Sequence, residues 1–598
     1  FTPNNKLNYR TFQLQDNFTY YMGKHTLTAG FNLERLQFEN VFFPGSQSVY
    51  VYNSLADWYA ATDANPANDP TLRRFQLRYS ALPGGAEPVQ PTKVTYMGVY
   101  LQDEFEPIKN LNITAGLRVD VPKFADTGFA NSTVETLTFR DPDGNPYSIN
   151  TKQLPKSTAL ISPRLGFNYD VFGNRSTQVR GGTGLFTGRP VFVWISNQIG
   201  NNGVLTGFEE LNNTTLRPFN PNPTAYIPAT PTLPSSVELA ATDPDFKFPQ
   251  VWRTNIAVDQ KLPFGLVGTL EFIYSQDVNG ITYFNANLPA AQSSFGNPDG
   301  RLQWTQNRLY PSAPYTVTSA EVLTNTNKGY SQSFTVKIEK PMTKGFYAMA
   351  AYNFGRAKNI IDPGSIARGS WTNNPIVFDP NNAPLAYNNQ DQRHRVIATA
   401  SYRKEYLNFG ATQISLFWEG RNQGRYSYRV SNDMNGDGAN NDLIYIPRDQ
   451  SDMIFETYTP TGASAPYTAA QQSADWDAFV SQDPYLSKNR GDWAERNGAL
   501  LPWVFRADLS IAQEFFLDVN GKRNTLQVRA DIINFGNMLS TMFAKSAPFG
   551  EFSNEGRWGV GEVPVTTQPL SYRSKNAQGQ PVYRLVPLSV TNGVVNPI

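Results

Sequence analysis

The sequence predicts an all-β fold, a large antiparallel β-barrel that spans a membrane. Three observations predict it: apolar and polar residues alternate along many segments, short and long connections alternate along the chain, and aromatic residues are abundant while charges are few. We find no run of about eighteen apolar residues, which is the length a spanning helix needs. A membrane would therefore have to be crossed by closed β-structure, because hydrocarbon leaves open backbone groups unsatisfied.

The composition excludes several other classes of protein. The 598 residues include 51 basic and 50 acidic side chains, a net charge of +1, so nothing indicates a nucleic-acid partner. Charged residues make up 17% and aromatic residues 13% of the chain, and Trp and Tyr favour the membrane interface. Cysteine is absent, which excludes disulfide bonds, thiolate metal sites, a catalytic cysteine and an acylated cysteine anchor within this chain.

The alternation has a period of two. In residues 111–121 (LNITAGLRVDV) every second side chain is small or apolar, and the positions between them hold Asn, Thr, Gly, Arg and Asp. Residues 334–339, 505–511 and 526–532 repeat this pattern. Because successive side chains of a strand point to opposite faces, each segment would have one apolar and one polar face.

The connections distinguish a membrane barrel from a soluble β-sandwich. Short turns are expected at residues 22–25, 106–110, 172–175, 262–265, 341–345, 405–408 and 518–523. Long polar links are expected at residues 37–92, 122–158, 188–248, 276–328, 357–390 and 422–501. Strict alternation of the two predicts about seven hairpins, or about fourteen strands, with tight turns on the periplasmic side and long extracellular loops. Within the loops, residues 54–61 and 473–480 are predicted to be helical, each starting at a Ser or Asp cap.

One long link contains a candidate calcium loop, SNDMNGDGANNDL. Oxygen-bearing side chains at alternate positions and a glycine that permits a sharp turn match the first half of such a loop. The candidate ligands are Asp433, Asn435, Asp437 and Asp442, with Gly438 at the turn. Ile444 stands where the twelfth-position acid is expected, so an Asx-rich surface turn is the alternative. A bound calcium ion would stiffen this extracellular loop.

The chain offers little for catalysis. Its two histidines, His25 and His394, lie far apart in sequence and lack a catalytic companion pattern, so we expect no enzyme and place both near the barrel rims. The charges predicted to face inward, such as Arg118, Asp120 and Lys337, are expected to pair with one another. The aromatic loop residues could line a substrate mouth or could pack the loops on themselves; they are Trp371, Trp476, Tyr485 and Trp493.

Several segments resemble TonB-dependent outer-membrane receptors. The clearest is the mid-barrel pair SPRLGFNYDVFGN (162–174) and RGGTGLFTGRP (180–190). Residues 23–32, 96–105, 391–402 and 530–537 carry the same resemblance. More narrowly, the chain resembles the Oar-like branch, which is common in Bacteroidetes and myxobacteria, at residues 258–275, 432–447 and 482–504. Together these matches cover nearly the whole chain, and their order and spacing are more specific than any single match.

The resemblance implies a 22-stranded barrel with an N-terminal plug in the outer membrane of a Gram-negative cell, energised by TonB–ExbB–ExbD. The chain departs from that pattern because no plug or TonB box precedes Phe1 and because TNGVVNPI lacks the closing strand with a terminal aromatic residue. We therefore expect residues 1–598 to form a partial barrel domain that lacks the plug and the closing strand.

The resemblance favours a transporter that moves a large or scarce substrate across the outer membrane, with the extracellular loops capturing ligand. Its expected partners are outer-membrane lipids, the TonB system through the plug, and a surface lipoprotein or secretion-complex subunits. The alternative is a barrel that serves as an assembly or interaction partner in a protein secretion or surface complex. An outer-membrane enzyme and a secreted adhesin are further alternatives; the scarcity of histidine argues against the first, and the second would be soluble without detergent.

Overall fold

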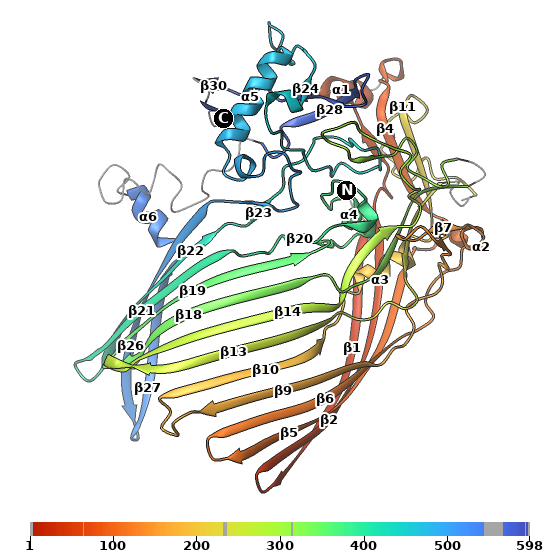
Figure 1. Cartoon of the computed structure of the whole chain (residues 1–598). Coiled ribbons are helices and arrows are strands. Elements are labelled where there is room, and N and C mark those ends of the chain that lie inside the picture. The colour runs from red at the N-terminus through yellow and green to blue at the C-terminus, as the bar shows by residue number, and fades with distance from the viewer. Residues whose placement is uncertain are drawn as a thin grey trace.

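The computed structural model describes residues 4–63, 65–230, 236–312, 315–542, 566–591 and 594–595. Its main element is a 17-stranded sheet in which fourteen long strands form a curved wall (Figure 1). These are β1 (Asn4–Met22), β2 (His25–Phe43), β5 (Gln90–Ile108), β6 (Leu111–Phe124), β9 (Leu160–Asp170), β10 (Thr177–Thr187), β13 (Gln250–Leu262), β14 (Leu266–Asn285), β18 (Tyr330–Thr343), β19 (Phe346–Asn359), β21 (His394–Tyr406), β22 (Gly410–Asn422), β26 (Trp503–Val519) and β27 (Lys522–Ile532).

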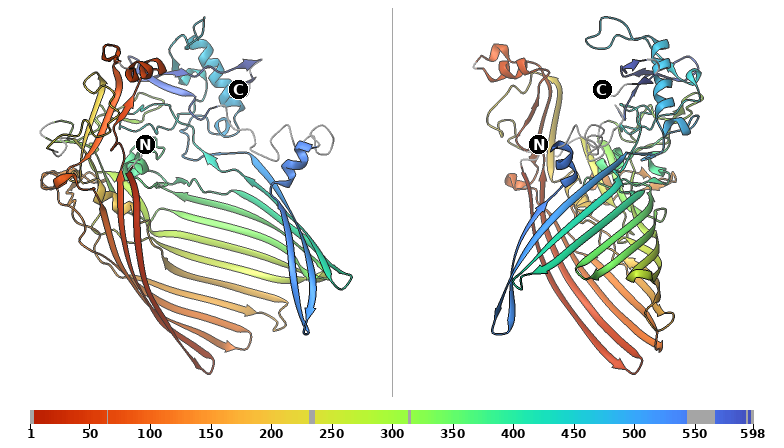
Figure 2. Two further views of the ribbon diagram at one scale, coloured as in Figure 1. Left: turned by 180° about the vertical axis from the view of Figure 1, so that it is seen from behind. Right: turned by 90° about the vertical axis from the view of Figure 1, so that its left-hand side faces the viewer.

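Every neighbouring pair of these long strands is antiparallel, and their order across the wall follows the order of the chain. The strands are 11 to 20 residues long, enough for the nine to eleven residues that a tilted membrane strand needs. β1 and β27 are the two edges of the wall, and within the described residues no pairing joins them (Figure 2). The predicted antiparallel barrel fold is confirmed as far as this wall extends.

The short turns all lie at one end of the wall, along its left and lower edge in Figure 1, and the long connections lie at the other end. The seven turns fall where the sequence predicts them. Five of them contain a glycine in the left-handed region, for example Gly23 with φ +60° and Gly345 with φ +81°, where an L side chain would be strained. The predicted alternation of turns and loops is therefore confirmed.

The register places the alternate apolar side chains on one continuous face. Ile414 of β22 lies beside Tyr402 of β21 and Ile511 of β26, and all three side chains are exposed. Leu270 and Phe334 belong to the same exposed apolar face on neighbouring strands. A soluble protein rarely exposes an apolar surface of this extent. The face is the belt that contacts lipid.

Aromatic rings gather on this face near its outer end. Trp503 stacks on His394 at 6.0 Å and on Phe505 at 6.1 Å, and Trp418 stacks on Phe505 at 5.8 Å between ring centroids. The Tyr352 hydroxyl lies 2.8 Å from His394 Nδ1. Aromatic girdles of this kind mark the boundary between membrane and water. His394 thus lies at the outer rim, as the sequence predicts.

The opposite face carries charges that are paired. Arg180 of β10 contacts Asp259 and Glu271, each at 3.0 Å, across two further strands. Arg403 contacts Glu514 at 2.7 Å. Other pairs join residues two apart on one strand, namely Arg118–Asp120, Lys337–Glu339, Arg506–Asp508 and Arg529–Asp531. The predicted inward pairing is confirmed, although many pairs run along a strand rather than between strands.

One charge that interrupts the apolar pattern has a partner near the turns. Asp103 Oδ2 lies 2.8 Å from Nδ1 of His25, which begins β2 directly after the first turn and stacks on Phe105 at 4.4 Å. Both residues lie near the periplasmic end of the wall. A carboxylate is tolerated there because the cost of a charge on the lipid face falls towards zero near the interface.

The long connections form a layer of folded structure beyond the outer rim. None of the helices in the described part of the chain combines the length and the apolar character needed to cross a membrane. The helices are α1 (Leu55–Thr62), α2 (Ser132–Glu135), α3 (Val193–Gly200), α4 (Ala367–Thr372), α5 (Ala469–Gln482) and α6 (Phe535–Met542). The additional strands are β3 (Val49–Val51), β4 (Leu72–Ser80), β7 (Phe139–Arg140), β8 (Pro146–Tyr147), β11 (Thr206–Thr214), β12 (Ser236–Thr242), β15 (Ser293–Ser294), β16 (Leu302–Gln303), β17 (Thr316–Thr326), β20 (Ala386–Tyr387), β23 (Arg425–Tyr426), β24 (Ile454–Phe455), β25 (Ala499–Leu500), β28 (Leu570–Lys575), β29 (Pro581–Leu585), β30 (Val590–Thr591) and β31 (Val594–Val595).

The apolar belt predicts that a new charge destabilises the protein on one face of the wall but not on the other. Ile414→Arg places a guanidinium against lipid, and we expect it to lower the free energy of unfolding in lipid vesicles by about 2–4 kcal/mol. The control is Ser415→Arg on the next residue, whose side chain points to the polar face and should change the stability much less. Unfolding in urea, followed by the gel mobility of unheated samples, measures both. Equal effects of the two substitutions would contradict the assignment of the faces.

Candidate functional site

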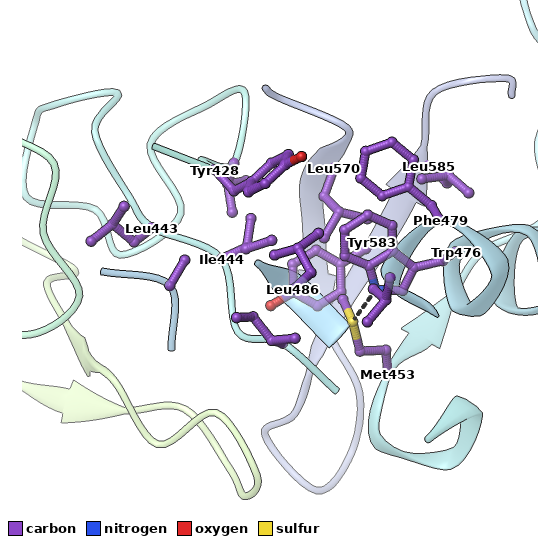
Figure 3. Packing of buried hydrophobic residues seen from close by; sticks show 14 of the residues in the cluster. Tyr428, Leu443, Ile444, Met453, Trp476, Phe479, Leu486, Leu570, Tyr583 and Leu585 are labelled. Carbon is purple, nitrogen blue, oxygen red and sulfur yellow. Dashed lines mark hydrogen bonds between the residues drawn. The ribbon is translucent and has the colours of Figure 1, made fainter. Parts of the chain in front are cut away.

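The largest folded part of the outer layer has its own hydrophobic core (Figure 3). Residues 425–500 and 566–591 supply most of it, and we call these two segments the loop body. The fully or nearly buried side chains of this core include Tyr428, Ile444, Ile446, Trp476, Val480, Leu486, Leu570 and Leu585. The Trp476 side chain is 1% exposed, and its indole N–H donates to Met453 Sδ at 3.1 Å. The loop therefore has a defined shape that could present a binding surface.

Helix α5 forms because local capping and apolar spacing agree. Thr468 and Gln471 make a capping box, in which each side chain accepts from the backbone N–H of the other. Trp476, Phe479 and Val480 then fall on one face, three and four residues apart, and are buried. The helix predicted at residues 473–480 is confirmed, but it begins about one turn earlier because the cap is Thr468. The predicted helix at residues 54–61 is also confirmed, with Ser54 as its N-cap.

The aromatic loop residues pack the loops on themselves. Trp371 and Trp476 are 3% and 1% exposed, respectively, so neither offers a ring to a ligand. Trp493 packs edge-on against Phe378 at 4.9 Å, and the Tyr485 hydroxyl accepts from the Glu495 backbone N–H at 2.7 Å. Of the two roles that the sequence left open for these residues, the structure supports the structural one.

The four candidate calcium ligands lie together inside the loop body. Asn435, Asp437 and Asp442 are buried, and most of their oxygens accept backbone N–H groups. Asp433 accepts from Gly436 at 2.7 Å and Gly438 at 2.9 Å. Asp437 accepts from Ala439 and Asp442 from Met434, each at 2.8 Å. This is the bonding expected of an Asx-rich turn, and it also draws the carboxylates towards one another.

A buried arginine from another loop reaches the same place. Arg301 is fully buried and contacts Asp299 at 2.7 Å and Asp442 at 3.3 Å, and it donates to the Leu443 carbonyl at 2.8 Å. We call this arrangement the Arg301 clamp. It ties the loop between β14 and β18 to the loop between β22 and β26. A buried cation with two carboxylate partners and a carbonyl partner is well satisfied.

The carboxylates outnumber this cation. Burial raises the pKa of Asp437 well above its usual range, and the nearby Asp442 and Asp433 raise it further. Burial also raises the pKa of Asp442 to about 6, although Arg301 opposes the rise. Among the described residues, no three His, Asp or Glu side chains converge closely enough to hold a metal ion. Calcium would need Asn435 and backbone carbonyl groups as further ligands, so the calcium site stays a prediction.

The two histidines lie at opposite ends of the wall. His25 follows a periplasmic turn and pairs with Asp103, whereas His394 belongs to the aromatic girdle at the outer rim. They cannot share a substrate. Their partners account for both in structural terms.

Comparison with known proteins identifies the kind of domain. A model of the family described as "Outer membrane beta barrel domain" matches residues 1–560. No curated protein matches the chain significantly. Similar solved structures include the FrpB iron transporter of Neisseria meningitidis (11% identity, TM-score 0.42) and the outer membrane transporter YddB of Escherichia coli (12% identity, TM-score 0.43). Another is a mutant of the ferric enterobactin receptor PfeA of Pseudomonas aeruginosa (10% identity, TM-score 0.41). The aligned regions cover 89%, 88% and 89% of this chain and 52%, 53% and 49% of those chains, so the chain spans about half the length of each.

The core of the loop body predicts a local effect of one substitution. Trp476→Ala should lower the free energy of unfolding of the loop body by about 3–5 kcal/mol, because it removes a fully buried ring. Hydrogen exchange of peptides from α5 measures this. The control is Trp58→Ala in α1, whose ring is exposed and whose loss should leave exchange unchanged. Faster exchange in the strands of the wall would show that the loop body does not unfold by itself.

The calcium site predicts an effect of the ion on the same region. We expect Ca²⁺ at neutral pH to slow proteolysis of the loop body, because the ion would offset the buried charge of Asp433, Asp437 and Asp442. Asp437→Asn should remove the effect, whereas Asp449→Asn, an acid elsewhere in the loop body, should retain it. Equal cleavage with calcium and with a chelator would leave the Asx-rich turn as the whole explanation.

Proposed function

We propose that this chain, which belongs to the outer membrane beta barrel domain family, is the barrel of a TonB-dependent transporter of the Oar-like branch. Its extracellular loops would capture a large or scarce substrate at the cell surface. The chain is located in the outer membrane, with lipid around its apolar belt. TonB–ExbB–ExbD would supply energy through a plug, as the resemblance of the barrel motifs implies.

The observation that carries this proposal is the polar face of the wall. Its charges are bonded to one another, as in the contacts of Arg180 with Asp259 and Glu271 and of Arg403 with Glu514. Most of these side chains remain partly exposed, so they suit a water-filled interior or contact with a plug. A charged inner face behind an apolar outer face is what a solute-conducting barrel requires.

The open edges support a larger barrel than the described wall. The side chains of β1 and β27 are almost all exposed, and within the described residues each strand pairs on one side only. Unpaired backbone groups are not stable in hydrocarbon. We therefore infer that further strands close the barrel, which agrees with the 22-stranded architecture of the resembling receptors and leaves room for a plug.

The folded loop body also suits the alternative role, an assembly or interaction partner in a protein secretion or surface complex. A compact body with its own core can dock a lipoprotein or a secretion subunit as well as a solute. We propose no catalytic role, since His25 and His394 lie at opposite rims. The two roles differ in whether TonB engages the protein.

Cross-linking in living cells separates them. An affinity-tagged form of the complete protein, produced from its own gene, should yield a covalent adduct with TonB when cells are treated with a short cross-linker. The same treatment of cells without TonB is the control. Adducts with secretion or surface subunits and none with TonB would overturn the transporter role and support the assembly role.

A further inference from the structure

A cavity of about 980 Å³ lies among the extracellular loops, apart from the loop body. On one side its walls are β4 and β11, which pair with each other, and on the other side they are β12 and β17. Helix α4 adds Arg368 to the lining. Four of the long connections thus meet here. The volume is near the upper end of the range for sites that hold small molecules.

Arginine is the most prominent charge in this cavity. Arg78, Arg217, Arg308 and Arg368 line it. Arg217 is already neutralised, because it makes two hydrogen bonds to Glu209, at 2.7 and 3.1 Å. Among the described residues, no carboxylate accepts a hydrogen bond from the other three, Arg78, Arg308 and Arg368. They are the groups available to a ligand.

Arg78 is held in place but makes no ion pair with the described residues. Its guanidinium lies over the Phe208 ring at 4.9 Å and donates to the Thr206 hydroxyl at 3.1 Å. Its Nε is buried and has no hydrogen-bond partner in the described part of the chain. Burial lowers the pKa of Arg78, as expected for a cation removed from water, although arginine stays protonated in proteins. The structure thus fixes a donor without using all of its N–H groups.

Arg308 and Arg368 lie close enough to affect each other. Burial lowers the pKa of Arg308, and the charge of Arg368 lowers it further. Arg368 donates to the Ser319 hydroxyl at 2.9 Å and lies 3.7 Å from Glu238, a long contact for an ion pair. Arg308 has no ion-pair partner among the described residues. Among the described residues Glu238 is the one carboxylate in contact with these arginines. Glu210 also lines the cavity but accepts from Gln76, so three arginines face two glutamates and positive charge is in excess.

A further carboxyl group, Glu321, lies near the cavity but adds little negative charge to it. Glu321 of β17 is fully buried beside Ser319, which donates to it at 3.0 Å. Burial raises its pKa to about 8, and the neighbouring Glu238 contributes to the rise. The surroundings of Glu321 therefore favour its neutral form. Arg78, Arg308 and Arg368 then outnumber the two lining glutamates that make no hydrogen bond to an arginine, Glu210 and Glu238.

We propose that this cavity binds a solute, or the end of a longer one, that presents oxyanion groups to Arg78, Arg308 and Arg368. Carboxylate, sulfate and phosphate share the geometry that a guanidinium bonds with two parallel N–H groups. Placement over Phe208 and Thr206 orders Arg78 before the ligand arrives, which reduces the entropy lost on binding. The inference rests on the proposed function in one respect, because capture at the cell surface gives such a site its use.

Titration calorimetry of the complete protein in detergent tests the site with defined probes, namely inorganic phosphate, sulfate and citrate, with glycerol as the neutral control. We expect at least one oxyanion to bind and glycerol not to bind, with weaker binding as salt is added. Arg308→Gln and Arg368→Gln should each weaken binding roughly tenfold, since each removes a charge-assisted contact. The ranking of the three probes identifies which oxyanion the cavity prefers.

Two further variants separate recognition from damage to the fold. Glu238→Gln removes the competing carboxylate and should tighten binding, which a damaged loop could not do. Arg73→Gln, on the same strand as Arg78 but outside the cavity lining, should leave binding unchanged. Absence of binding by all three oxyanions, weaker binding in Glu238→Gln, or equal losses in Arg73→Gln and Arg308→Gln would each overturn the proposal. None of these results alters the cross-linking of the protein to TonB, so the two hypotheses fail separately.

Discussion

Hydrocarbon offers no hydrogen-bond partner to a peptide group, and the architecture of the wall follows from that constraint. Each long strand must bond to its neighbours along its whole length, as the uninterrupted register of β1 with β2 and of β22 with β26 shows. Pairing in turn fixes which side chains meet lipid. The same strand register places the apolar belt around Ile414 and Leu270 on one face of the wall and the paired charges around Arg180 on the other.

Outside the membrane the constraint is lifted, and the chain folds by the rules of soluble proteins. Water can satisfy backbone groups there, so the loops make short helices, small sheets and irregular turns around apolar cores. The loop body buries Trp476 and Ile444, and a second cluster buries Ile195 and Phe248. Charges behave differently in the two regions. On the wall, charged side chains form ion pairs while they remain partly exposed to water. In the loops, Arg301 and Glu321 are fully buried and depend on a few specific contacts.

The wall could be predicted from the sequence because its determinants are local. Period-two alternation and turns such as 22–25 and 341–345 are visible within a few residues, and they place all fourteen long strands. The loop cores could not be predicted in this way. Phe295, Val377 and Leu570 meet in one cluster but come from three distant segments with no shared period. The same holds for Arg78, Arg308 and Arg368, since nothing in their separate neighbourhoods indicates that four loops bring them together. The partner of Asp103 also escaped prediction, because register rather than sequence brings His25 beside it.

The Arg301 clamp bears on how such proteins diversify. Loops on a barrel are often pictured as interchangeable parts that can be exchanged one at a time. Here Arg301 of one loop is buried against Asp442 and the Leu443 carbonyl of another, and neither half is complete without the other. If one of the two loops were replaced alone, Arg301 or Asp442 would stay buried without its partner, which would destabilise the protein. The two loops must therefore evolve together. New specificities must arise by paired changes in both loops or by substitutions on their surface.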